Sequence, residues 1–262
     1  MSAPSSERGL MIEERRRRIR ELLREQGRVT VEALAARFGI SQVTIRADLS
    51  ILESAGALTR THGGALTVLD ADQPLDVKQL QHRSEKQRIA AAAAALIEDG
   101  ETIILDSGTT TAEIARRIRT LELESINVIT NALNIAALLI DVRSVRLIVP
   151  GGILRRESNS LAGPIAETTL ATLRANRLYL GADGIDPQSG VMTPHLAEAE
   201  LNAKMIGISQ QVVVVADSSK FARRNISLIA RIEQLHLLIT DRAAPAEAVA
   251  QLRQRGVEVQ LV

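Results

Sequence analysis

The feature that most constrains the fold is a series of seven short apolar runs that begins at Thr102. Most are near-continuous runs of Val, Ile and Leu, and helical patterns separate most of them, an order typical of parallel strands buried on both faces. The runs are TIIL, NVIT, VRLIVP, RLYLG, QVVVVA, HLLIT and VEVQLV. The sequence therefore predicts an α/β domain with a mostly parallel, helix-covered sheet.

The first 70 residues carry a different pattern. Apolar residues recur at helical spacing in three short segments, 13–26, 31–38 and 41–55, each followed by a glycine. The runs ALTRT and ALTVL follow, joined through HGG, and predict a hairpin. Three helices and a hairpin predict a winged helix-turn-helix. The Pro-containing, acidic segment 70–76 is typical of a linker, so we place a winged helix-turn-helix domain at 1–70 and an α/β domain at 71–262. Residues 77–98 are expected to form one Ala-rich helix.

Composition excludes several classes of site. The chain has no cysteine, and its four histidines are scattered, so we expect no metal site and no cofactor. The N-terminus is charged and no run of 18 apolar residues occurs, so we expect a cytoplasmic protein without a membrane partner. Residues 1–64 hold 11 Arg and no Lys against 8 acidic residues, a basic excess that favours a polyanionic partner.

Polar and small residues follow the ends of several predicted strands. Ligands of open α/β sheets bind beyond the carboxyl ends of strands, so we expect these residues to converge on one crevice. The clearest segment is LDSGTTT, in which Gly108 allows close backbone approach and the threonines begin a helix that favours an anion. The candidate ligand-binding residues are Asp106, Ser107, Gly108, Thr109, Thr110, Thr111, Thr130, Asn131, Gly151, Gly152, Asp183, Glu200, Lys204 and Lys220.

Each of these motifs has a structural alternative. The Ser and Thr residues would also serve as helix caps, and Lys220 would also suit a solvated turn. An acidic pair, Glu198 and Glu200, would also complement a helix dipole, while Arg155 and Arg156 would also be simply exposed. No GxxxxGK[ST] or GxGxxG follows a predicted strand, which argues against both common nucleotide sites.

The third predicted helix carries residues suited to a DNA groove. Gln and Arg side chains make bidentate contacts with base edges, and a wing approaches the sugar-phosphate backbone. Asp48 is expected to orient an arginine, and of the four arginines 15–18 not all can face DNA, a solvated face being the alternative. The candidate DNA-binding residues are Ser41, Gln42, Thr44, Arg46, Arg60 and His62.

Motifs in both predicted domains carry a resemblance to a known family. The first is RRRIRELLREQGRVTVEALAARFGISQVTIRADLSILESAGALTRTHGGA, and the later ones are EKQRIAAAAAALIEDG, ILDSGTTT, VITNALNIA, VPGGILRRESNSLAGP, GADGID, EAELNAKMI and VADSSKF. The first resembles the N-terminal domain of DeoR-type transcriptional repressors and the others resemble their sugar-phosphate sensor domain, so the resemblance covers nearly the whole chain beyond the first dozen residues. The resemblance implies a repressor of a carbohydrate operon, released from double-stranded operator DNA by a phosphorylated sugar. A symmetric operator would require a homo-oligomer, most simply a dimer or tetramer. The family often has two arginines where this chain has Arg46-Ala47.

The second domain is similar in turn to ribose-5-phosphate isomerase, which leaves a sugar-phosphate isomerase with an added helical domain as the alternative. The first acidic position of the isomerase's DGAD segment falls on Leu180 of this chain, and the Glu of the isomerase's EK pair falls on Ala203. Its Lys-Gly-Gly run has no counterpart before His195. The similarity therefore implies a retained phosphate cradle without the proton-transfer groups, so we expect a protein that is not an enzyme. An activator would differ from a repressor only in the sign of the coupling between metabolite and DNA.

Overall fold

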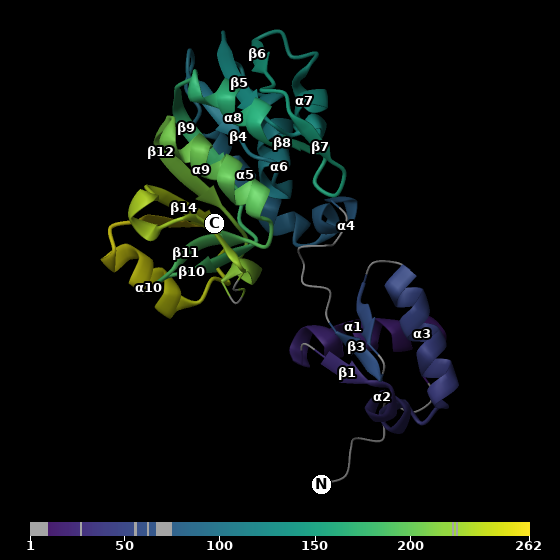
Figure 1. Cartoon of the computed structure of the whole chain (residues 1–262). Helices are drawn as coiled ribbons and strands as arrows, with labels where there is room; N and C mark the ends of the chain where they lie inside the picture. The colour runs from purple at the N-terminus through teal and green to yellow at the C-terminus, as the bar shows by residue number, and fades with distance from the viewer. Residues whose placement is uncertain are drawn as a thin grey trace. The chain divides into compact units, whose positions relative to one another are not determined.

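The computed structural model describes residues 10–26, 28–54, 57–61, 63–66, 75–221, 223 and 225–262 (Figure 1). Contacts divide the chain into two compact units, Met1–Pro74 and Leu75–Val262, which are described separately below. The predicted boundary between residues 70 and 71 falls in the stretch 67–74, outside the described residues.

The N-terminal unit is built from three helices and a small antiparallel sheet of order β1-β3-β2. Pairing of Arg60 with Ala65 confirms the predicted hairpin, and a third strand precedes the second helix. The apolar stripes of the three helices meet in one core around Phe38, Ile45 and Leu49. The elements are α1 (Ile12–Gln26), β1 (Arg28–Thr30), α2 (Val31–Phe38), α3 (Gln42–Ser54), β2 (Thr59–Thr61) and β3 (Gly64–Leu66).

The C-terminal unit is organised by a seven-stranded sheet of order β15-β14-β12-β9-β4-β5-β6. All its strand pairs are parallel. Each of the seven apolar runs forms one of its strands, which confirms the predicted fold class. The strands are β4 (Thr102–Leu105), β5 (Ile126–Thr130), β6 (Val145–Ile148), β9 (Ala175–Leu180), β12 (Ser209–Val215), β14 (Leu237–Thr240) and β15 (Glu258–Leu261).

Helices cover both faces of this sheet (Figure 1). Alternate residues of a strand enter different cores, as Ile104 does on one face and Ile103 and Leu105 do on the other. The face of Ile103 packs against α5 (Arg83–Ala94), α6 (Thr109–Ile118) and α7 (Leu133–Leu139). The face of Ile104 packs against α8 (Pro164–Ala171), α9 (Leu196–Gly207) and α10 (Ala246–Gln254). Both faces of the central strands are buried, which explains the continuous apolar run of β4, whereas the edge strand β15 alternates, with Val259 buried between exposed Glu258 and Gln260.

Shorter elements surround the sheet. They are α4 (Leu75–Leu80), the hairpin of β7 (Ile153–Arg155) and β8 (Ser160–Ala162), the strands β10 (Gly184–Asp186), β11 (Gly190–Thr193) and β13 (Ser227–Ala230), and the 3-10 turns η2 (Ser218–Lys220) and η3 (Ile232–Gln234). The expectation of one helix over 77–98 was wrong. His82 adopts a left-handed conformation, with φ 50°, which interrupts the hydrogen-bond ladder between α4 and α5. None of the helices in the described ranges is both long and apolar enough to cross a membrane.

The order of the sheet reverses between β4 and β9. The strands β4, β5 and β6 extend the sheet toward one edge, and the chain then returns to place β9, β12, β14 and β15 toward the other. Loops leaving the carboxyl ends of two strands diverge at such a reversal, and the crevice between them is the usual ligand site of an open α/β sheet. The residues that follow β4 and β9 are therefore the candidates for a ligand site.

Candidate functional site

Asp106 joins the two loops that leave the sheet at its reversal point. Its Oδ1 accepts hydrogen bonds from the Gly108 N–H at 2.9 Å and the Thr111 hydroxyl at 2.7 Å. Its Oδ2 accepts from the Gly181 N–H, beyond β9, at 2.7 Å. Burial raises the pKa of Asp106, while these three donors oppose the rise. Both oxygens of the carboxyl group are thus engaged in holding the loop.

The Gly108 loop leads directly into the N-terminus of α6, as predicted. A Cβ on Gly108 would lie 3.0 Å from Asp106 Oδ1 and 3.1 Å from Thr111 Oγ1, so a larger residue would displace the loop. The Thr111 hydroxyl also contacts the Gly108 carbonyl oxygen at 2.7 Å, which makes it part of the support. The N–H groups of Thr109 and Thr110 begin the helix, where backbone donors lack intrahelical acceptors. These donors and the Ser107 hydroxyl are the groups suited to an anion.

Asp183, after β9, lies among cationic side chains. Lys78 Nζ is 3.3 Å from its Oδ1, and the Thr193 hydroxyl donates to its Oδ2 at 3.1 Å. Burial alone would raise the pKa of Asp183, but the charges of Lys78 and Lys220 and the hydrogen bonds lower it overall. Sequence reasoning identified Lys220 but missed Lys78, because an isolated lysine on a short helix carries no motif.

A buried lysine completes this charged group. Lys86 on α5 is 3% exposed, and its Nζ donates to the Lys78 carbonyl oxygen at 2.5 Å. Burial is the main cause that lowers the pKa of Lys86 to about 8; the attraction of Asp217 opposes it and the charge of Lys220 reinforces it. Burial also lowers the pKa of Lys220, with a further contribution from Arg223 and opposition from Asp183 and Asp217. Several positive charges are therefore held close to the end of β9 and the start of η2.

Glu198 and Arg155 form an ion pair beside the same residues. The distance from Arg155 Nη1 to Glu198 Oε2 is 3.2 Å, and both side chains are about four-fifths buried. Burial is the main cause that raises the pKa of Glu198 to about 7; the charges of Asp183 and Asp106 reinforce it and the charge of Arg155 opposes it. The interpretations of Glu198 as a helix-dipole charge and of Arg155 as simply exposed were incomplete, because the tertiary fold buries both.

Thr130 and Asn131 lie at the end of β5, next to the β7–β8 hairpin. The Thr130 hydroxyl accepts from the Ala132 N–H at 3.1 Å, and Asn131 Nδ2 donates to the Leu161 carbonyl oxygen at 3.0 Å. Asn131 Oδ1 is buried without a hydrogen-bond partner among the described residues. Gly151 and Gly152 precede the hairpin with φ of 81° and 122°, and a Cβ on Gly152 would meet Ala162 O at 2.7 Å.

Two predicted ligand residues lie apart from this group. Glu200 and Lys204 are exposed on α9. Glu200 is two residues from Glu198, and a helix turns by about 100° per residue, so the two side chains leave opposite sides of α9. The structure thus brings together the ends of β4, β5, β9 and β12 with Lys78, Lys86, Arg155 and Glu198, but it does not add Glu200 or Lys204.

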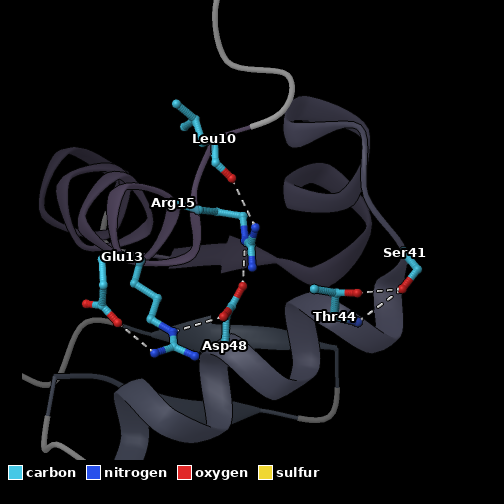
Figure 2. Close-up of polar contacts among 7 residues, drawn as sticks. Leu10, Glu13, Arg15, Ser41, Thr44 and Asp48 are labelled. Atoms are coloured by element: carbon cyan, nitrogen blue, oxygen red, sulfur yellow. Dashed lines mark hydrogen bonds and ion pairs between the residues drawn. The ribbon is translucent and has the colours of Figure 1, made fainter.

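In the N-terminal unit, Asp48 connects the third helix to the first (Figure 2). Its Oδ2 lies 2.6 Å from Arg15 Nε and its Oδ1 lies 2.9 Å from Arg16 Nε. The expectation that Asp48 orients an arginine is confirmed, and the alternative of a solvated arginine face is wrong for Arg15, which is 7% exposed. The paired arginines fix α1 against α3.

The predicted DNA contacts lie on exposed positions of α3 and the wing. Ser41 and Thr44 hydroxyls are 2.9 Å apart, and Arg46 Nη2 donates to Gln42 Oε1 at 3.2 Å. The Arg60 N–H donates to Glu53 Oε1 at 3.0 Å, which ties the wing to α3. His62 lies outside the described residues. Within the described part, no group of three His, Asp or Glu residues is arranged to hold a metal ion.

Comparison with known proteins identifies both units. Residues 15–69 match the family model of the DeoR-like helix-turn-helix domain, and residues 81–242 match that of the DeoR C-terminal sensor domain. The chain belongs to the DeoR family. It is 41% identical to a putative aga operon transcriptional repressor of Escherichia coli O157:H7, over 95% of this chain and 93% of that protein. It is 30% identical to the glycerol-3-phosphate regulon repressor of Escherichia coli K12, over 92% and 95% of the two chains.

Among solved structures, ribose 5-phosphate isomerase A of Methanocaldococcus jannaschii aligns with a TM-score of 0.39 and 19% identity, over 54% of this chain and 55% of that one. The DeoR-family membership rests on the sequence matches. It makes the chain a transcriptional regulator, and the helix-turn-helix domain implies that it binds DNA.

Proposed function

We propose that this DeoR-family regulator is a cytoplasmic, homo-oligomeric repressor of a carbohydrate-use operon, released from its operator by a phosphorylated sugar. The observation that carries the proposal is the Gly108 loop at the reversal of the sheet. There, backbone N–H groups at the start of α6 offer the donors that a phosphate ester requires, while Lys78 and Lys220 supply positive charge at the end of the neighbouring strand.

The proposed ligand contacts follow from which polar groups support the loop and which are left to bind a ligand. The Asp106 carboxyl group and the Thr111 hydroxyl support the loop, so the phosphate would meet Ser107, Thr109 and Thr110. Asp183 and Asn131 have oxygens suited to the hydroxyl groups of the sugar. The effector must favour one arrangement of the oligomer over another, since equal affinity for both would leave DNA binding unchanged.

A thermal-shift screen tests the sensor half of the proposal. The full chain is heated with a panel of sugar phosphates, glycerol 3-phosphate and the matching unphosphorylated compounds. A ligand that binds only the folded state at about 100 times its Kd adds roughly 2.7 kcal/mol of stability. We expect shifts only with phosphorylated members. Equal shifts with unphosphorylated sugars would contradict a phosphate site.

Two substitutions test whether the N-terminal unit binds DNA and the C-terminal unit binds the phosphosugar. Arg46→Ala is expected to weaken binding to DNA fragments upstream of the gene by about 1–3 kcal/mol without changing the phosphosugar shift. Gly108→Val is expected to abolish the shift and leave DNA binding intact, because the new side chain would collide with Asp106 and Thr111. If either variant lost both activities equally, the proposed separation would be wrong.

A second candidate function is sugar-phosphate isomerisation. The observation that favours it is the pair Asp183 and Glu198, whose pKa values move in opposite directions, as those of an acid and a base in catalysis often do. We nevertheless expect no turnover, because Asp183 is held by Lys78 and Glu198 by Arg155. An aldose–ketose assay with pentose and hexose phosphates tests this, and turnover abolished by Glu198→Gln would establish the enzyme instead.

A further inference from the structure

The outward face of α3 is apolar at its centre. Ile45, Leu49 and Leu52 form the buried stripe of the helix, whereas Val43 is 73% exposed and Ala47 is also exposed. With about 100° of rotation per residue, Val43 and Ala47 point almost directly away from that stripe. The predicted DNA contacts Gln42 and Arg46 instead lie along one flank, rotated toward the buried stripe by about 60° to 140° from Val43 and Ala47.

The polar and apolar residues of this face offer different kinds of recognition. Gln42 and Arg46 already hydrogen-bond to each other, so their amide and guanidinium groups are presented together at one side. Val43 and Ala47 have no side-chain donor or acceptor. In the major groove, the apolar group that a base pair presents is the C5 methyl of thymine, so this is the group that a valine there can recognise.

A DNA groove suits this surface better than another protein does. A specific protein interface covers roughly 800 Å² on each partner, far more than one valine and one alanine provide. The first turn of a recognition helix is the part that contacts base edges, and Val43 is the second residue of α3. Arg46 adds positive charge beside it, which complements the phosphate backbone.

We propose that Val43 reads a thymine methyl group in the operator, and that the small side chain of Ala47 allows α3 to approach the bases closely. This inference rests on the proposed DNA-binding repressor function and adds the chemical feature that the helix selects. Cytosine at the same position would offer no methyl group. Its amino group would also lose water against Val43 without gaining an acceptor, which costs binding free energy.

The test begins with the DNA that the protein itself selects. The purified full chain enriches duplexes from a randomised pool, and each thymine of the enriched fragment is then replaced, one at a time, by deoxyuridine. This replacement removes only the C5 methyl group and keeps base pairing. We expect one thymine in each recognised half-site at which the loss of the methyl weakens binding about fourfold, the size expected for one buried methyl group.

Variants of the helix assign the effect to Val43. In Val43→Ala the native and deoxyuridine fragments should bind equally at that position, whereas Val43→Thr, which keeps one methyl group, should retain part of the difference. Ile51→Ala serves as the matched control, because Ile51 is a 48% exposed apolar residue two turns further along α3. It should retain the full fourfold difference.

The outcomes separate this inference from the proposed function. Enrichment without any deoxyuridine effect, or an effect that persists unchanged in Val43→Ala, would overturn the reading of a thymine methyl while leaving DNA binding in place. Failure to enrich any duplex would overturn the proposed repressor and this inference together.

Discussion

Each unit of the protein contains a buried aspartate that joins two elements, and the two differ in the donors they use. Asp48 is held by the guanidinium groups of Arg15 and Arg16. Asp106 is held by two backbone N–H groups and one hydroxyl. Asp48 therefore joins helices through paired charges, whereas Asp106 sets the path of the backbone around a ligand loop. We therefore expect the negative charge of Asp48 to stabilise the N-terminal unit, and the positions of the two acceptor oxygens of Asp106 to maintain the ligand loop.

The largest expected effect is that of Asp48→Asn. It keeps the shape but leaves Arg15, whose side chain is 8% exposed, without a counter-charge. Breaking such a pair costs about 3 kcal/mol, a large part of the stability of a unit this small. Chemical denaturation followed by hydrogen exchange should show the N-terminal unit unfolding at much lower denaturant concentration, with the sensor domain unchanged.

The control for this variant is Glu14→Gln. Glu14 is about half exposed and lies 3.9 Å from Arg17, so its loss should change the free energy of unfolding by less than about 0.5 kcal/mol. Equal destabilisation by the two variants would show that the buried charge of Asp48 has no special role.

Asp106→Asn should have the next largest effect. Its new NH₂ group would face donors that now bind a carboxylate oxygen, at a cost of about 1–3 kcal/mol. We expect a lower unfolding midpoint for the sensor domain and the loss of the phosphosugar-induced thermal shift, with DNA binding retained. A variant that kept the full thermal shift would exclude Asp106 as the support of the loop.

The sensor domain should also lose stability as pH rises toward neutrality. The pKa of Glu198 is about 7 in the folded protein, against an ordinary value of 4.5, so the folded state binds this proton more tightly. The contribution of Glu198 to the free energy of unfolding is fully present below pH 4.5 and is lost as the pH rises through 7. The unfolding free energy should fall by at most about 1.4 kcal/mol per pH unit in this range.

Glu198→Gln isolates this dependence. The difference in unfolding free energy between native and variant proteins should slope between pH 4.5 and 7 and be flat above that range. Asp183, whose pKa is lowered, contributes in a separate window below its ordinary value of 3.8. A flat difference across the whole range would mean that Glu198 ionises as it does in water.

The smallest expected effect is that of Arg60→Ala in the wing. The ion pair of Arg60 with Glu53 is exposed and 3.9 Å long, so the stability of the unit should change by less than about 0.5 kcal/mol. If Arg60 contacts a phosphate, the slope of log K against log salt should fall by about 1, equally for all fragments. A sequence-dependent loss would place Arg60 at a base instead.

The sequence alone determined the seven strands, the winged helix-turn-helix and the Gly108 loop. Each depends on local periodicity or on a glycine beside a strand end, and such signals are complete within a few neighbouring residues. The break at His82 was missed because the helical pattern continues across it and only the backbone conformation reveals the turn.

Only the tertiary structure decided which charged residues meet. Lys78 and Asp183 are 105 residues apart in the chain, and Arg155 and Glu198 are 43 apart, so no local pattern links them. The pKa values of Glu198 on α9 and Lys86 on α5 likewise follow mainly from burial, which only the tertiary structure shows. Helix and strand preferences act over a few residues, so local sequence determines the elements, whereas the meeting of these charged side chains depends on long-range packing.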